Sequence, residues 1–350
     1  MVHDGREVRD ESSSGRSPTL KEIAEVAGVH ISTVSRVLRQ SEPSSGWTNA
    51  ALRVRSTAEE LGYRPNFLAA SLRTRRTHTI GVVMPRLTDG VIATACQSIE
   101  EAARLAGYQV LLATPPDEMK AQLNSIKLLV SRQVDGLILS SLHLGDMEPI
   151  RQIEKIEIPV IATNRSVGDV IPSVTVADRH GGFLATEHLI SLGHRRIGVI
   201  AGPRHASTAW ERTMGYFEAL DKHGIARDES LVVHTEFEVS GGVLGAHQLL
   251  NVPDRPTAIF SVNDTAAIGA MGAARDRGLH IPEDLSLVGY NDIPIVSQLP
   301  TPLTTISSPS GAMGAVALQQ LLRGINGMEM TSMELPVSLV VRSSTSAPKN

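Results

Sequence analysis

The sequence predicts a small all-helical head followed by a larger α/β body whose two lobes each contain a parallel sheet. Amphipathic helical segments follow one another around Gly28, which predicts the head. From Thr79 onward, continuous runs of valine, isoleucine and leucine alternate with helical segments, as in parallel sheets covered on both faces. The alternation occurs as two series, the second beginning near His180, and two series predict two lobes.

Composition and charge narrow the class of protein. The 350 residues carry a net charge of −4, yet residues 19–78 contain nine lysine and arginine residues and only five acidic ones. A basic segment on an acidic chain favours a head that meets an anionic polymer, although a solvated surface can give the same asymmetry.

No apolar run approaches the ~18 residues that span a bilayer. Residues 1–18 are expected to be a disordered arm rather than a signal peptide. The single Cys96 excludes an internal disulfide and a cysteine-based zinc site, so we expect a cytoplasmic protein.

The head is predicted to contain three helices in residues 19–64. Thr19 and Glu22 form a capping box that begins the first helix, and Gly28 ends it with a tight turn. A second short helix covers residues 31–39, and a third covers about 49–61. The first two have helix-turn-helix spacing, in which the second helix enters the major groove of DNA.

The outward face of the second helix carries chemistry suited to DNA. Val34, Val37 and Leu38 face the first helix, which leaves a polar set outward: Ile31, Ser32, Thr33, Ser35, Arg36 and Arg39. Serine and threonine hydroxyls can position the helix on phosphates, and Arg36 can bond a guanine with two donors. The alternative is an ordinary pair of helices with a solvated face.

Residues 65–78 are predicted to be a hinge helix and linker. Pro65 and Asn66 stop the preceding helix and cap the next, and the alanine-rich segment 67–73 is too short to be stable alone. Docked on DNA, it could insert Leu72 between base steps in the minor groove. The alternative is a flexible linker whose leucines touch the body.

Polar side chains stand where the predicted body strands end. In open parallel sheets, ligands bind beyond the carboxyl ends of the strands, so a cleft between two lobes is the expected small-molecule site. The candidates are Asn164, Arg165, Arg212, Phe237, Asn263, Asp264 and Asp292. Arginine and aspartate there can bind hydroxyls or carboxylates by paired hydrogen bonds. Asp264 could equally cap the next helix, and Asn263 is expected to order the turn.

Seven motifs occur in an order that resembles the LacI/GalR family of bacterial transcriptional regulators. They are TLKEIAEVAGVHISTVSRVL, ELGYRPNFLAASLRTRRTHTIGVV, LGHRRIGVIAGP, PTAIFSVNDTAAIGA, PEDLSLVGYNDIP, PLTTISSP and LVVRSST. The resemblance runs from Thr19 to Thr345. It implies a periplasmic-binding-protein-like clamp over residues 79–345, with strands near 304 and 335 returning the chain between lobes and a tail at 346–350.

The resemblance also implies roles for individual residues. Ile31, Ser32 and Arg36 would read bases, Thr33 and Ser35 would contact phosphates, and Leu72 would intercalate at the operator centre. The full expected DNA-binding set is Thr19, Ile31, Ser32, Thr33, Ser35, Arg36, Arg39, Asn66, Ala69 and Leu72. Arg212 and Asp264 match effector-contacting positions, and Asn164 and Phe237 match effector-lining positions. Asp292 completes the expected effector-binding set, although it falls in a motif for which a structural role is the alternative.

Four features depart from the family pattern. Arg39 stands where the family usually has asparagine after the recognition helix, and it is expected to add a phosphate contact. His30 replaces a small residue such as serine, which is expected to weaken the cap of the recognition helix, although a neutral histidine can accept a hydrogen bond there. The altered loop of residues 40–51 places Ala51 at a typical arginine position. Val91 and Ile92 stand where many members carry an aromatic pair that stacks on a sugar.

These observations favour a regulator over two other classes. An enzyme is disfavoured because the sequence has no dinucleotide glycine fingerprint, phosphate-binding loop or Gly-x-Ser-x-Gly elbow. His180, His188 and His194 share no helical face, and we expect neither metal nor cofactor. A receptor that only binds sugar would need an export signal and no head.

We therefore expect a homodimeric repressor of a carbohydrate-utilisation operon that binds a palindromic operator. A small molecule in the cleft, expected to be a sugar, would control it; a protein co-regulator or non-sugar effector is the alternative. The sequence does not set the sign of that control.

Overall fold

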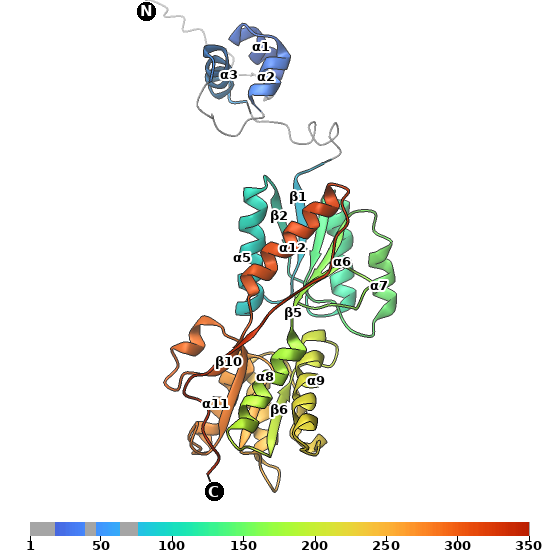
Figure 1. Ribbon diagram of the computed structural model, residues 1–350. Coiled ribbons are helices and arrows are strands. Elements are labelled where there is room, and N and C mark those ends of the chain that lie inside the picture. Colours follow the sequence, from blue (N-terminus) through green and yellow to red (C-terminus); the bar gives the residue numbers. More distant parts are fainter. Residues whose placement is uncertain (1–17, 39–46, 64–75, 350) are drawn as a thin grey trace, which may run out of the picture. The chain divides into compact units, whose positions relative to one another are not determined.

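The computed structural model describes residues 18–38, 47–63 and 76–349 (Figure 1). The chain forms two compact units, residues 1–75 and residues 76–350. The expected arm, the altered loop before Trp47 and the expected hinge helix lie outside the described residues. Four expected DNA contacts lie outside them too: Arg39, Asn66, Ala69 and Leu72.

Three helices pack around one small core in the head. They are α1 (Leu20–Ala27), α2 (Ile31–Val37) and α3 (Asn49–Glu60). The capping box is present, since the Glu22 amide donates to Thr19 Oγ1 and the Thr19 amide donates to Glu22 Oε2. Gly28 ends α1 with a left-handed φ of 65°. Ile23, Val34 and Val54, one from each helix, are fully buried.

The first lobe of the body is a six-stranded sheet with helices on both faces. Its strand order is β11-β5-β4-β3-β1-β2, and every pairing is parallel. The strands are β1 (Thr79–Val83), β2 (Gln109–Ala113), β3 (Gly136–Leu139), β4 (Val160–Thr163), β5 (Ser173–Val176) and β11 (Met333–Leu335). The helices are α5 (Gly90–Leu105), α6 (Met119–Ser131), α7 (Met147–Glu154) and α12 (Ser310–Ile325). Apolar residues of α5 and α12 form the core on one face of the sheet, and those of α6 and α7 form it on the other.

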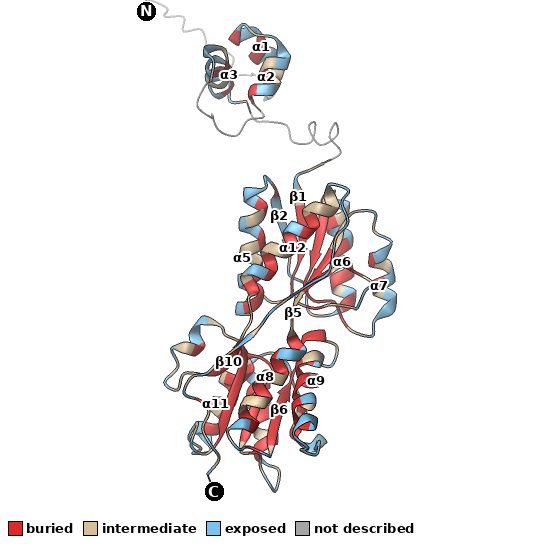
Figure 2. Ribbon diagram, in the orientation of Figure 1, coloured by how far each residue is buried: buried red, intermediate tan, exposed pale blue. Residues whose placement is uncertain are grey.

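The second lobe repeats this architecture with strand order β12-β10-β9-β8-β6-β7. The strands are β6 (Ile197–Ala201), β7 (Val232–His234), β8 (Ala258–Ser261), β9 (Ser286–Asn291), β10 (Thr304–Ser307) and β12 (Ser338–Val340). Helices α8 (Asp178–Ser191) and α9 (Ser207–Lys222) share one core cluster, and α10 (Val239–Leu250) and α11 (Asp264–Asp276) share another. Short 3-10 turns cover Glu229–Leu231 and Pro294–Ser297. Figure 2 shows the result as buried strands beneath helices whose outer faces are exposed.

The predicted parallel sheets are confirmed, with one addition. The edge strand β12 runs antiparallel to β10, because the chain returns from β11 in the first lobe and enters the second sheet from the opposite direction. The chain crosses between lobes after β5, after β10 and between β11 and β12. Three crossings tie the lobes together beside the cleft while leaving the strand ends open to it.

Candidate functional sites

The recognition helix α2 is held by one face and presents the other. Val34 and Val37 are buried, whereas Ile31, Ser32 and Arg36 are exposed, and Thr33 and Ser35 are half-buried. The described helix ends at Val37, with Leu38 as its C-cap, two residues before the end that its pattern predicts. Thr19 differs from the others, because its hydroxyl contacts Glu22 within the capping box of α1.

His30 caps the recognition helix, as a neutral histidine was expected to be able to do in place of a serine. The Ser32 amide donates to His30 Nδ1 at 3.3 Å, and Ser32 Oγ lies 2.7 Å from the same nitrogen. An imidazole nitrogen can accept an amide proton only when it carries a lone pair, so the neutral ring does what a serine hydroxyl does at this position.

Two arginines of α3 hold the head together, and sequence reasoning did not single them out. Arg53 Nε donates to the Ala27 carbonyl at 3.5 Å, at the end of α1 where unpaired carbonyls favour a cation. The Arg55 guanidinium lies 4.6 Å from the Trp47 ring centroid. Ala51, at the typical arginine position, is buried in the head core.

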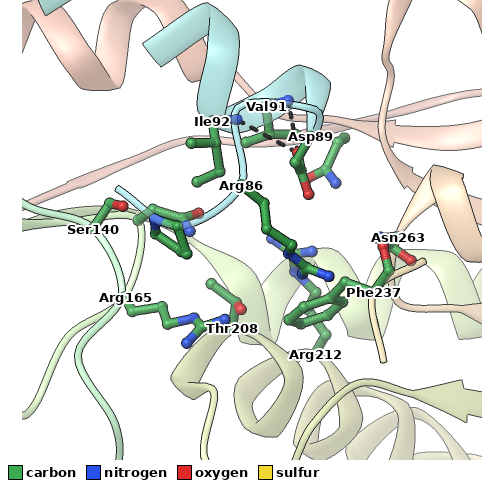
Figure 3. Close-up of a pocket in the computed structure, with 13 residues that line it drawn as sticks. Arg86, Asp89, Val91, Ile92, Ser140, Arg165, Thr208, Arg212, Phe237 and Asn263 are labelled. Atoms are coloured by element: carbon green, nitrogen blue, oxygen red, sulfur yellow. Dashed lines mark hydrogen bonds between the residues drawn. The ribbon is translucent and has the colours of Figure 1, made fainter. Parts of the chain in front are cut away.

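The second site is a cavity between the lobes, at the carboxyl ends of strands from both sheets (Figure 3). The first lobe contributes Pro85, Arg86, Asp89, Val91, Ile92, Ser140, Asn164 and Arg165. The second lobe contributes Thr208, Arg212, Phe237, Asn263 and Asn291. This is where parallel α/β sheets place their ligands, because loops from neighbouring strands converge at that edge.

Three of the five residues expected to bind the effector line this cavity: Asn164, Arg212 and Phe237. Arg212 is buried at 4% exposure; its Nε donates to Asp178 Oδ1 at 2.7 Å and its Nη1 to the Val262 carbonyl at 2.7 Å. Its guanidinium also lies 3.7 Å from the Tyr290 ring centroid. Helix α8 can approach α9 here because Gly182 has no side chain; a Cβ there would lie 2.0 Å from the Arg212 carbonyl oxygen. The arginine is therefore fixed before any ligand arrives.

The other two expected effector residues, Asp264 and Asp292, do not line the cavity. Asp264 is fully buried and turned into the second lobe, where Thr305 Oγ1 donates to its Oδ1 at 2.6 Å and the Ile293 amide donates to its Oδ2 at 2.9 Å. Burial raises the pKa of Asp264 to about 7. Asp292 forms an ion pair with Arg342 at 2.6 Å, in keeping with a structural role.

Asn263 takes the position expected of a turn residue and also reaches the cavity. Its Oδ1 accepts from the Ala266 amide at 3.1 Å and caps α11, so Asp264 is not the capping residue. Its Nδ2 donates to the Phe237 carbonyl at 3.1 Å and fixes the loop that carries the Phe237 ring.

Polar contacts cross between the lobes on either side of the cavity. Arg86 Nη1 lies 2.6 Å from Glu238 Oε1. The Leu144 amide donates to the His205 carbonyl at 2.8 Å, and the Ser166 amide donates to Ser207 Oγ at 3.0 Å. These contacts bridge the two lobes, so a change in the angle between the lobes would alter them.

A compact polar cluster lies beside these contacts. Arg165 binds both oxygens of Asp117, at 3.1 and 2.8 Å, and His143 Nε2 lies 2.8 Å from Asp117 Oδ1. Burial would raise the pKa of Asp117, but the hydrogen bonds from His143 and Arg165 outweigh it and hold the pKa well below its usual range. Asp117, His143 and His205 bring ligand atoms within 4.8 Å of one another, but the guanidinium on the shared carboxylate opposes a second cation.

Three histidines that lie near one another in the sequence, His180, His188 and His194, have structural surroundings. His188 Nε2 lies 2.9 Å from Thr345 Oγ1, and His194 lies within 3.0 Å of hydroxyls of Thr257 and Ser286. Burial lowers the pKa of both rings. His180 is exposed and stacks on Phe183. His188 and His194 tie the C-terminal segment to the second lobe, through Thr345 and the Ser346 carbonyl.

Family models match both parts of the chain. Residues 19–66 match the model of bacterial regulatory proteins of the lacI family, and residues 77–342 match the model of periplasmic binding proteins and the sugar-binding domain of the LacI family. The chain belongs to the LacI family of bacterial regulatory proteins.

Relatives and solved structures agree with this LacI-family assignment. The ribose operon repressor of Haemophilus influenzae is 36% identical over 313 residues, covering 88% of this chain and 92% of that protein. A lac repressor dimer bound to operator and the anti-inducer ONPF is 30% identical with a TM-score of 0.84, covering 95% of this chain and 100% of that one. A complex of the regulator CelR with cellobiose is 32% identical with a TM-score of 0.71, covering 93% and 99%.

This LacI-family chain is thus a DNA-binding transcriptional regulator with a helix-turn-helix head and a two-lobed body. Its relatives are transcriptional repressors. Within the described ranges, no helix is both long and apolar enough to cross a membrane.

Proposed function

We propose that this protein represses a carbohydrate-utilisation operon. It binds a palindromic operator as a homodimer, and a sugar or sugar derivative between the lobes controls its affinity for DNA. It acts in the cytoplasm, as a regulator and not as an enzyme. The observation that carries the proposal is the outward face of α2, where Ile31, Ser32 and Arg36 are exposed while the opposite face is buried.

Base and phosphate contacts are divided along that helix. Ile31, Ser32 and Arg36 contact base edges, with Arg36 suited to a guanine, and Thr33 and Ser35 contact phosphates. Arg39 adds a phosphate contact. One head covers about half an operator, so two copies occupy successive major grooves.

The proposed domains divide the whole chain. We assign residues 1–18 to an arm, 19–64 to the DNA-binding domain, 65–78 to the hinge and linker, 79–345 to the effector-binding and dimerisation domain, and 346–350 to a tail. The hinge carries Asn66, Ala69 and Leu72, and paired hinges open the minor groove between the two heads.

The effector site is the inter-lobe cavity, and its contacts explain the coupling. Asn164, Arg212 and Phe237 contact the effector directly. Asp264 holds the loop at Ile293 and strand β10 at Thr305, so it supports the wall of the cavity without contacting the effector. An effector that changes the angle between the lobes changes the spacing of the two hinges, and DNA must then change effector affinity by the same factor.

The test is a selection of genome fragments on purified full-length protein, compared with the Arg36→Ala variant. The proposal predicts an enriched palindrome for the natural chain and loss of that preference in the variant. Enrichment without a palindrome contradicts the dimer, and no enrichment contradicts sequence-specific binding. Enrichment of a palindrome whose affinity no small molecule shifts favours a protein co-regulator instead.

A further inference from the structure

The inter-lobe cavity is lined by three guanidinium groups and a single carboxylate. Arg86, Arg165 and Arg212 line it, with Asp89 as the one acidic residue among its lining side chains. Figure 3 shows Arg86 extending from the first lobe into the middle of this group. The carboxylates that pair with the arginines are Glu238, Asp117 and Asp178, and none of them lines the cavity. A ligand in the cavity would therefore contact the guanidinium groups directly, whereas the carboxylates that pair with them do not line the cavity.

Hydrogen-bond donors exceed acceptors at the same surface. Asp89 Oδ1 accepts from the amides of Val91 and Ile92, at 2.9 and 3.4 Å, so half of this carboxylate is used to cap α5. Asn291 Oδ1 is buried and has no hydrogen-bond partner. Hydroxyl groups both donate and accept, so they suit Asn291 and the remaining Asp89 oxygen, but the guanidiniums only donate. The cavity is thus matched by a ligand that combines hydroxyls with a group that only accepts.

The backbone turns sharply at three lining residues. Arg86 has φ 42°, Asn164 has φ 65° and Asn291 has φ 110°, all in the left-handed region that non-glycine residues rarely adopt. Such conformations persist where the surrounding structure holds them, and they aim side chains that ordinary strand ends would direct elsewhere. The left-handed backbone of Arg86 directs its side chain into the cavity. The ion pair that this side chain forms with Glu238 is partly exposed to solvent, since the two side chains are 29% and 53% exposed.

We infer that the effector is a sugar carrying an oxyanion, a carboxylate or a phosphate group, which binds Arg86 and Arg212. The inference rests on the proposed function, since it names the ligand class of the same cavity. Asn164, Asn291 and Asp89 receive the hydroxyls, and Val91, Ile92 and Phe237 cover the apolar face of the ring. Because exposed ion pairs are weak, the oxyanion displaces Glu238 from Arg86. Guanidinium pairs bind oxyanions through charge-assisted, two-point hydrogen bonds.

The experiment is isothermal titration calorimetry on the full chain with matched ligands. D-glucuronate and D-gluconate test a carboxylate, glucose 6-phosphate tests a phosphate, and D-glucose is the neutral match. The inference predicts that one acidic ligand binds at least tenfold more tightly than glucose and that added salt weakens its binding. Tighter binding of the neutral sugar, or no binding of any acidic ligand, overturns it. Failure of the proposed function is separate, since it appears as the absence of an enriched operator.

Two single variants distinguish recognition of charge from closure of the lobes. Arg86→Gln removes the cation and its ion pair with Glu238, whereas Glu238→Gln removes the same ion pair and keeps the cation. The inference predicts that Arg86→Gln weakens binding of the acidic ligand about ten- to a hundredfold, as expected for a lost charge-assisted bond, and leaves Glu238→Gln equal or tighter. Equal weakening in both variants means that the pair only closes the lobes, and it overturns the assignment of Arg86. Arg151→Gln, on the exposed face of α7, is the control for total charge.

Discussion

Replacing Asp264 by asparagine should remove a pH-dependent cost to the stability of the body. In the folded protein, burial raises the pKa of this carboxyl from 3.8 to about 7. Between these values the folded state binds more protons at this site than the unfolded state does. Its contribution therefore destabilises the fold progressively as pH rises from about 4 to about 7. At ~1.36 kcal/mol per pKa unit, the ionised group costs up to about 4 kcal/mol above pH 7.

The asparagine variant can keep both contacts. Its amide oxygen can accept from the Ile293 amide and its NH₂ group can donate to Thr305 Oγ1, so the hydrogen bonds at Asp264 are replaced in kind. The assay is urea unfolding of the natural chain and the variant from pH 4.5 to 8. The difference in unfolding free energy between them isolates Asp264 from the other titrating groups.

This difference should grow in favour of Asp264→Asn as pH rises, and it should level off above about pH 7. Asp276→Asn, at the exposed far end of the same helix, should show no such trend. A pH-independent difference, or a variant that loses stability as pH rises, would refute the reasoning that burial dominates this carboxyl.

Three further substitutions test other parts of the molecule. His30→Ala should cost about 0.5–2 kcal/mol of head stability, because α2 loses its cap, and His30→Ser should restore it; equal thermal unfolding of all three would contradict the capping role. Arg36→Ala should cost ~1–3 kcal/mol at the operator and relax one base preference in binding assays, whereas equal loss on every sequence would make it a phosphate contact. Arg212→Gln should cost about 3–5 kcal/mol in urea unfolding because Asp178 keeps an unpaired buried charge, and adding Asp178→Asn should recover part of that.

Local chemistry made much of the fold predictable. The capping box at Thr19, the left-handed turn at Gly28 and the alternation of strands and helices depend on neighbouring residues, so the sequence is enough to place them. Strand-end reasoning also located the cavity and five of its residues, because the ligand edge of a parallel sheet follows from strand direction alone. These are Asn164, Arg165, Arg212, Phe237 and Asn263.

What could not be predicted depends on distant partners and on side-chain direction. Arg86 escaped notice because its position in the cavity is set by a left-handed backbone and by Glu238, far along the chain. Asp264 follows a strand as an effector residue would, yet Thr305 and the Ile293 amide draw its carboxylate into the lobe. His30 lies outside the usual set of capping residues, and only the geometry reveals that Nδ1 reaches the Ser32 amide.

The central claim is that occupation of the inter-lobe cavity changes affinity for the operator. The most direct measurement is the dissociation constant for the selected palindrome with and without a saturating compound that binds the body, repeated with Arg212→Gln. The dissociation constant of the natural chain should shift by about 5- to 150-fold, the usual range of such coupling, and that of the variant should not shift. An unchanged dissociation constant in the natural chain, with the compound demonstrably bound, would contradict it.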